Sequence, residues 1–341
     1  MDFANNAISP VGSNSNGFQG VLYGNKHTIK RIKFNIVNSP VSSGYKSIGL
    51  FAYLNGASVY DLTFDSSNTY SYTPNSNVVA GMLAAHAKNT TVVNVSNYAN
   101  MTVSNTGVTN GNAYIFLEGI FGHSQGYARM YKIAYQGNFN TVAGADSVTA
   151  FQDNGLFVGG IIGSNQGMSE LTLDAAYVNF NLTVKHGGIC SGALIGGLGT
   201  GAALYKLSNV LANCEGTYSG TMNSPDLYGL TGWMNHGTSL KPLSGSYLKN
   251  IYFSSETYVG SYFHNDGGAT AWPTAPSGTY KYPATIGNAN LVTNPVDTKA
   301  EVGAAAAANS TLKTYFNINS SAATATGKLN TTGNIAQRAC C

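Results

Sequence analysis

Along most of the chain, apolar residues alternate with polar ones in short runs that Gly and Asn interrupt. In the run from Ala57 to Phe64, for example, apolar residues recur at nearly every second position. This period of two is typical of β-strands, and the period of an amphipathic helix is nearly absent. Gly and Asn tolerate the positive φ values of tight turns. The pattern therefore predicts an all-β chain of many short strands.

One sequence element returns along the chain: a small or apolar residue, then Gly, then two or three apolar residues, a polar turn and an alternating strand. Its six copies have their first glycine at Gly49, Gly81, Gly119, Gly160, Gly192 and Gly229. The spacing of 32 to 41 residues is that of a coil of two or three strands that buries its apolar side chains against the next coil. A β-propeller has a similar period, but the chain lacks the Trp-Asp signature of its blades. We therefore expect an elongated parallel β-solenoid.

The first coils also carry a recognisable motif. Residues Ile8–Ser13 and Phe18–Ile29, followed by Gly49–Leu62, resemble the GLUG-motif repeat proteins, although Tyr23 replaces the usual Asp and Lys26 the usual Gly. The resemblance covers residues 8–265, is strongest in the first two coils, and implies a pectate-lyase-like, right-handed parallel β-helix of the surface or adhesin type. It does not imply catalysis, because one fold hosts many functions.

The repeat fades near residue 265, so we expect a solenoid over residues 1–265 and a C-terminal capping or assembly segment over residues 266–341. This segment contains the one predicted helix, from Asp297 to Phe316, with Asp297 or Thr298 as its cap and an alanine-rich centre. Covering the last coil would protect its strand edges. Joining subunits is the alternative role.

Charge and composition exclude several functions. Charged residues make up 9% of the chain and the net charge is +3, which does not favour nucleic-acid binding. Acids are scarce, and both spaced pairs, Asp61 with Asp65 and Glu170 with Asp174, lie about 13 Å apart on one strand by the rise per residue. Glycoside hydrolysis needs a closer pair. We therefore predict that the protein is not an enzyme and has no cofactor and no metal site.

Other candidate residues are cysteines, sequons and histidines. Cys190 and Cys214 lie about one coil apart and could form a disulfide or a buried free pair. His123 and His236 follow the Gly-apolar element at comparable places and could align along one edge of the solenoid. Sequons for N-glycosylation begin at Asn89, Asn94, Asn100, Asn181, Asn309, Asn319 and Asn330.

Low charge and surfaces rich in Tyr, Asn and Thr favour packing against other copies or against sugars. The sequence predicts a structural or adhesive solenoid, extracellular or on a cell surface, or alternatively on a virion, that self-associates into an oligomer or filament. A module that binds surface glycans is the second hypothesis, and a polysaccharide-active enzyme is the third. No signal peptide and no membrane span are predicted.

Overall fold

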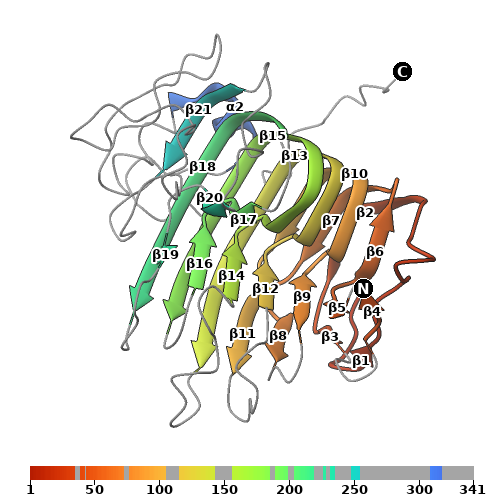
Figure 1. Ribbon diagram of the computed structural model, residues 1–341. Coiled ribbons are helices and arrows are strands. Elements are labelled where there is room, and N and C mark those ends of the chain that lie inside the picture. Colours follow the sequence, from red (N-terminus) through yellow and green to blue (C-terminus); the bar gives the residue numbers. More distant parts are fainter. Residues whose placement is uncertain are drawn as a thin grey trace.

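The protein is a parallel β-solenoid whose coils stack from the N-terminal end toward helix α2 (Figure 1). This architecture confirms the predicted fold class. The computed structural model describes the following residues: 1–34, 39–42, 44–72, 77–104, 115–142, 156–184, 189–198, 203–218, 226–227, 231–234, 247–253 and 308–316.

Three sheets form the walls of the solenoid. A two-stranded sheet pairs β1 (Ala7–Ile8) with β3 (Lys33–Phe34). The long sheet contains β2 (Val21–Ile29), β6 (Phe51–Asn55), β7 (Ser58–Phe64), β8 (Thr69–Tyr72), β10 (Ala84–Asn97), β11 (Asn100–Ser104), β13 (Phe121–Val142), β15 (Ile162–Val184), β17 (Ile195–Leu198), β18 (Leu204–Tyr218), β20 (Thr231–Met234) and β21 (Tyr247–Phe253). The short sheet contains β4 (Val41–Ser42), β5 (Tyr45–Ile48), β9 (Val78–Gly81), β12 (Ile115–Glu118), β14 (Leu156–Gly159), β16 (Ile189–Gly192) and β19 (Asp226–Leu227).

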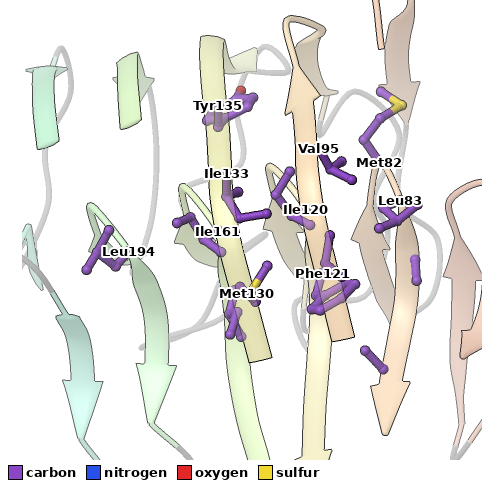
Figure 2. Close-up of a cluster of buried hydrophobic side chains, with 14 of the residues drawn as sticks. Met82, Leu83, Val95, Ile120, Phe121, Met130, Ile133, Tyr135, Ile161 and Leu194 are labelled. Atoms are coloured by element: carbon purple, nitrogen blue, oxygen red, sulfur yellow. The ribbon is translucent and has the colours of Figure 1, made fainter. Parts of the chain in front are cut away.

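Each coil bends sharply where a strand of the short sheet passes into the long sheet, at the predicted Gly-apolar element. The apolar residues of the bend point into the solenoid and stack on those of neighbouring coils (Figure 2). They include Met82, Leu83, Ile120, Ile161 and Leu194, each at most 1% exposed. Burying such a side chain contributes about 1.5–3 kcal/mol, so the repeated element supplies much of the core.

Two of the six glycines predicted to be equivalent lie one residue after the position that pairs in the short sheet. In the register of the short sheet, Gly81 lies beside Glu118, and Glu118 beside Gly159. The glycines taken from the sequence, Gly119 and Gly160, therefore follow this row instead of belonging to it. Glycine is required at the position after this row for a steric reason. A Cβ on Gly119 would lie 2.1 Å from the carbonyl oxygen of Gly160.

A second corner lies in the middle of the long strands, where one residue of each coil adopts a positive φ near 55°. The residues of this row are Asp61, Asn94, Lys132, Ala175, Asn209 and Asn250. Asn and Asp enter this left-handed region more easily than other non-glycine residues, which explains four of the six. Lys132 and Ala175 are the exceptions, and both are buried near α2.

Helix α2 (Ser310–Tyr315) packs against the side of the solenoid, on residues just beyond this corner. Here an outward row changes from hydroxyl to mostly apolar side chains: Thr28, Thr63, Ser96, Ala134, Tyr177, Leu211 and Tyr252. The last four belong to one buried cluster with Leu312 and Phe316. The described part of the predicted C-terminal segment thus lies along four coils. The rest of that segment, and the expected cap at Asp297 or Thr298, lie outside the described residues.

Asn309 begins the helix, although the sequence marked it only as a sequon. Its side-chain oxygen accepts a hydrogen bond from the backbone N–H of Leu312 at 3.0 Å. Its amide donates to Oδ1 of Asn209 at 3.1 Å and to the hydroxyl of Tyr252 at 3.4 Å. One residue therefore caps α2 and ties it to the corner row.

Replacing Leu312 with Ala is expected to weaken the docking of α2 by about 2–5 kcal/mol, because the side chain is fully buried in this cluster. Hydrogen exchange of the backbone amides of residues 310–316 measures the loss. Lys313→Ala is the control, because Lys313 is exposed on the same helix. Equal exchange rates in the two variants would contradict the described packing.

Among the described residues, no helix has the length and apolar character that a membrane crossing requires.

Candidate functional site

The outer face of the long sheet is a regular surface to which strands of successive coils contribute. Between two outward rows, the side chains of Val59, Val92 and Met130 point inward and are fully buried. The first outward row is Val21, Ser58, Thr91, Arg129, Thr172 and Lys206. The second is Tyr23, Tyr60, Val93, Tyr131, Asp174, Ser208 and Lys249. Because every row continues in register from coil to coil, this face extends along the axis of the solenoid (Figure 1).

The chemistry of the outer face changes along the axis. Its first three coils carry only uncharged side chains in these rows, and the rings of Tyr23 and Tyr60 stack with centroids 5.3 Å apart. The next coils carry an ionic cluster, in which the guanidinium of Arg129 lies 4.6 Å from the centroid of the Tyr127 ring. Such stacking leaves the edge of the guanidinium able to donate hydrogen bonds.

Glu170 lies at the centre of the ionic cluster. Its carboxylate is 3.4 Å from Nε of Arg129 and 3.9 Å from Nζ of Lys206, and it accepts a hydrogen bond from Thr172 at 3.0 Å. Burial alone would raise the pKa of Glu170. The hydrogen bond from Thr172 and the charges of Lys206 and Arg129 together lower it below the ordinary value. Glu170 therefore remains ionised at neutral pH and is poorly suited to donate a proton.

The other acids of this face hold the corner row in place. Asp174 accepts hydrogen bonds from the hydroxyl of Ser208 at 2.7 Å and from the amide of Asn209 at 2.8 Å. Asp61, two coils before the ionic cluster, accepts a hydrogen bond from the amide of Asn94. Each carboxylate is occupied by side chains of the following coil, so its role is structural.

Glu118 is the acid with the most unusual environment. It is fully buried at the bend between the sheets, and neither carboxyl oxygen has a hydrogen-bond partner within the part of the chain that the structure describes. Its carboxyl lies where a side chain on Gly163 would stand, since a Cβ there would be 1.6 Å from Oε1. Burial raises the pKa of Glu118 well above its usual value. The group is thus sealed from any substrate, in spite of its perturbed acidity.

A second cluster, the elbow cluster, fills the outer side of the bend. Its members come from neighbouring strands of both sheets and are in ring contact: Tyr45, Tyr53, His86, Phe116, His123 and Phe157. The imidazole centroids of His86 and His123 are 5.2 Å apart, and that of His123 is 4.4 Å from the Phe116 ring. Two histidines are therefore embedded in aromatic rings.

Burial decides the protonation of these histidines. Each is only 6% exposed, and neither Nε2 atom has a hydrogen-bond partner among the described residues. Desolvation lowers the pKa of His86 to about 4. Desolvation, and then the neighbouring His86, lower the pKa of His123 well below its usual value. Both imidazoles are neutral at pH 7 and too enclosed to act on an external substrate.

The sequence predicted that His123 would align with His236, which lies outside the described residues. The alignment with His236 therefore stays a prediction. The structure aligns His123 with His86, in direct register across β10 and β13. The signal was present, because each of the two histidines follows its residue of the short-sheet row, Gly81 or Glu118, by five positions. It becomes visible only once Glu118 is recognised as the equivalent of Gly81.

The predicted disulfide partners lie on different sheets. Cys190 is in β16 of the short sheet, in register with Phe157 of the preceding coil. Cys214 is in β18 of the long sheet, in register with Phe180. The two cysteines are thus not stacked at one coil position, and the disulfide between them stays a prediction.

The predicted glycosylation sites within the described residues occupy strands and the start of α2. Asn94 and Asn309 use their amide nitrogens in the hydrogen bonds given above, and the amide of Asn181 donates to Asn138 at 3.2 Å. The side-chain oxygens of Asn89 and Asn100 accept backbone N–H groups of the next coil. Asn319 and Asn330 lie outside the described residues. Glycosylation stays a prediction at all seven.

Neither a known protein family, nor a curated protein, nor a solved structure matches this chain. The parallel solenoid is compatible with the resemblance to GLUG-motif repeats, and membership in that family stays a prediction. Within the described ranges, no group of three or more His, Cys, Asp or Glu side chains gathers as a metal site.

Proposed function

We propose that the protein is a non-enzymatic structural or adhesive solenoid, displayed on a cell surface or a virion, whose contact surface is the outer face of the long sheet. The observation that carries this proposal is the composition of that face. Over successive coils it presents Tyr, Val, Thr and Ser in two straight rows, and the charged members of these rows begin only at β13. Exposed tyrosines and hydroxyls supply rigid apolar area together with hydrogen bonds, which suits adhesion.

The state of the acids supports a role other than catalysis. General acid–base chemistry on a sugar needs two carboxyl groups that face one bond. Glu170 is ion-paired, Asp174 is hydrogen-bonded to the next coil, and Glu118 is sealed in the bend. Glu170 and Asp174 are also about 13 Å apart by the rise of a strand, which exceeds the separation in either class of glycosidase.

A carbohydrate-binding module is the second candidate, and the ionic cluster favours it. Tyr127, Arg129, Glu170 and Lys206 place an aromatic ring, two cations and one carboxylate on three neighbouring strands of an exposed face. Sugar hydroxyls bind charged planar groups by paired hydrogen bonds, and sugar rings stack on aromatic side chains. The excess of cations favours a glycan that carries carboxylate or sulfate groups.

Native electrophoresis in gels that contain polysaccharides tests both candidates and the absence of catalysis together. On neutral and acidic polysaccharides, we expect retardation of the protein without release of reducing ends or unsaturated products. Tyr131→Ala should reduce the retardation several-fold, because Tyr131 is 37% exposed at the centre of the outer face. Arg129→Gln should reduce it on acidic polysaccharides alone if the ionic cluster is a glycan site.

Thr63→Ala is the matched control for these variants, since Thr63 faces outward on the other side of the corner row. Product release that Glu170→Gln abolishes would overturn the non-enzymatic proposal. Unchanged migration on every polysaccharide would remove glycans as the partner and leave adhesion to protein surfaces.

A further inference from the structure

The exposed large apolar side chains of the described residues gather at the N-terminal end of the solenoid. Five of the six belong to the first 41 residues, and their exposed fractions are 73% for Met1, 49% for Val11, 53% for Val21, 62% for Tyr23 and 64% for Val41. The sixth is Tyr131 on the outer face. Solenoids usually cover their terminal coils with a polar cap, because an apolar coil end in water favours association.

At this end the long sheet also has an open strand edge. Among the strands that the structure describes, β2 is the first in the order of the sheet and pairs with β7 alone. The carbonyl of Gly20 accepts the N–H of Ser58 at 3.1 Å. Successive peptide groups of a strand point to opposite sides, so the N–H and C=O groups of Val21 and Tyr23 point away from β7. An edge of this kind is a template for another strand.

The N-terminal segment covers only the other half of this coil. The carbonyl of Lys30 accepts the N–H of Phe3 at 3.0 Å, and the N–H of Lys30 donates to the carbonyl of Met1 at 2.9 Å. The segment continues in register as far as Ile8, which lies beside Phe34. The amino group of Met1 also donates to the carbonyl of Thr28, near the end of β2. The segment therefore pairs with the last residues of β2 and with the chain beyond them, and its described contacts do not reach Val21 and Tyr23.

At the opposite end of the solenoid, the described residues include no exposed large apolar side chain. In β21, the last strand of the long sheet, Ile251 is 1% exposed and Tyr252 is 8% exposed. In the first coil the position equivalent to Ile251 is His27, which is exposed. A head-to-tail fibre would need both ends open. An exposed edge on one end alone is instead matched by the same edge of another copy, related by a two-fold axis.

We infer that two copies of this chain join through their N-terminal ends, with β2 of one copy pairing antiparallel with β2 of the other around an axis at Leu22. In that register Val21 of each copy lies opposite Tyr23 of the other. The outward peptide groups of these residues then form two reciprocal pairs of hydrogen bonds. The partner in the self-association expected from the sequence is therefore a second copy of this chain, and the assembly is a closed dimer instead of an open filament. This inference rests on the proposed structural role.

The neighbouring residues limit the contact to this short stretch. After Tyr23, three residues of β2 (Gly24–Lys26) lie opposite the single residue Asp61, and this bulge bends the strand out of regular pairing. With Leu22 on the axis, Lys26 of one copy falls opposite Phe18 of the other. The two lysines therefore do not face each other, and no like charges are brought together in the paired stretch.

The first test is the molar mass of the full chain by light scattering across a concentration series. The unsubstituted protein is expected to have the mass of a dimer. Tyr23→Pro removes one outward N–H without breaking a bond to β7, so it should give a monomer that remains folded. Tyr23→Thr keeps the backbone groups and should weaken the dimer without abolishing it. Tyr131→Thr, the matched control on the outer face, should leave the mass unchanged.

Cysteine pairing tests the register and does not depend on the proline variant folding. Mixing Val21→Cys with Tyr23→Cys should give a covalent dimer on mild oxidation, because opposite residues lie within disulfide reach. Either variant alone should cross-link at least tenfold less, because its cysteines are offset along the strands. Equal cross-linking in the separate variants, a monomeric unsubstituted protein, or fibres under electron microscopy would overturn the inference.

Comparing the molar mass of the unsubstituted protein with its retardation on polysaccharides separates this inference from the proposed function. A monomer that is retarded keeps the adhesive face and overturns the dimer. A dimer that is not retarded on any polysaccharide supports the inference and counts against glycan adhesion alone.

Discussion

The double variant His86→Phe/His123→Phe is expected to keep at least about 3 kcal/mol more of its stability than the unsubstituted protein when the pH falls from 7 to 4, since His86 alone accounts for about that much. The folded state holds both imidazoles neutral, with the pKa of His86 lowered to about 4 and that of His123 lowered as well. In the unfolded chain a histidine takes up its proton near pH 6.5. Between these values the unfolded state binds more protons, so the stability present above pH 6.5 is lost as the pH falls toward 4.

The neighbours of the two histidines make phenylalanine a suitable replacement. Tyr53 stacks on His86 and Phe116 packs edge-on against His123, so a larger apolar ring keeps the aromatic contacts of the elbow cluster and removes the unpaired nitrogens. Urea midpoints at several pH values measure the effect. His27→Phe, at an exposed histidine of β2, is the control and should show the same pH dependence as the unsubstituted protein. Parallel curves for all three proteins would show that burial does not hold the two imidazoles neutral.

Gly119→Ala is expected to destabilise the solenoid by more than about 3 kcal/mol, at or beyond the upper limit for overpacking. The added Cβ would lie 2.1 Å from the carbonyl oxygen of Gly160 and 2.6 Å from the Tyr135 ring. The first atom is backbone of the next coil and the second is a fully buried ring, so neither moves without disturbing the bend. Each coil supports its neighbours, and the damage should spread to adjoining coils.

Limited proteolysis and the urea midpoint measure this loss. The control is Gly20→Ala, where the new Cβ meets only the side chain of Phe18, at 3.1 Å. That variant should cost less than about 1 kcal/mol. If both variants are equally stable, the close approach of consecutive bends at Gly119 is not a constraint on the fold.

The period of the repeat and the inward apolar pair were predictable from the sequence, because both follow from local patterns. The register between coils was not fully predictable. Aligning the copies on glycine placed Gly119 with Gly81, whereas the strands pair Glu118 with Gly81. A carboxyl group is not expected at a row of glycines, and it fits only because Gly163 of the following coil leaves room for it.

The contacts of the candidate site were likewise only partly predictable from the sequence. The separation of Glu170 from Asp174 along one strand predicts that they form no catalytic pair, and this stays a prediction. The partners of Glu170, Arg129 and Lys206, come from the coils on either side and are 41 and 36 residues away in sequence. Such contacts depend on register across coils of unequal length, so a period alone does not give them.

The predicted C-terminal helix was confirmed within the described residues over Ser310–Tyr315, but its place on the solenoid was not foreseen. The outward row under α2 alternates with inward residues like any other strand position. Only pairing across four coils brings Ala134, Tyr177, Leu211 and Tyr252 into one apolar stripe. The capping role of Asn309 was not predicted either, because the residues marked it only as a sequon and placed it inside a longer helix.

The stripe beneath α2 has a mechanical consequence for a rod that is anchored at one end and pulled at the other. Coils that touch only their neighbours would peel away one at a time under tension along the axis. The helix and its Asn309 bonds join residues contributed by four consecutive coils. Those four coils should therefore unfold as a single unit, at a higher force than the coils near β2, which lie outside this stripe.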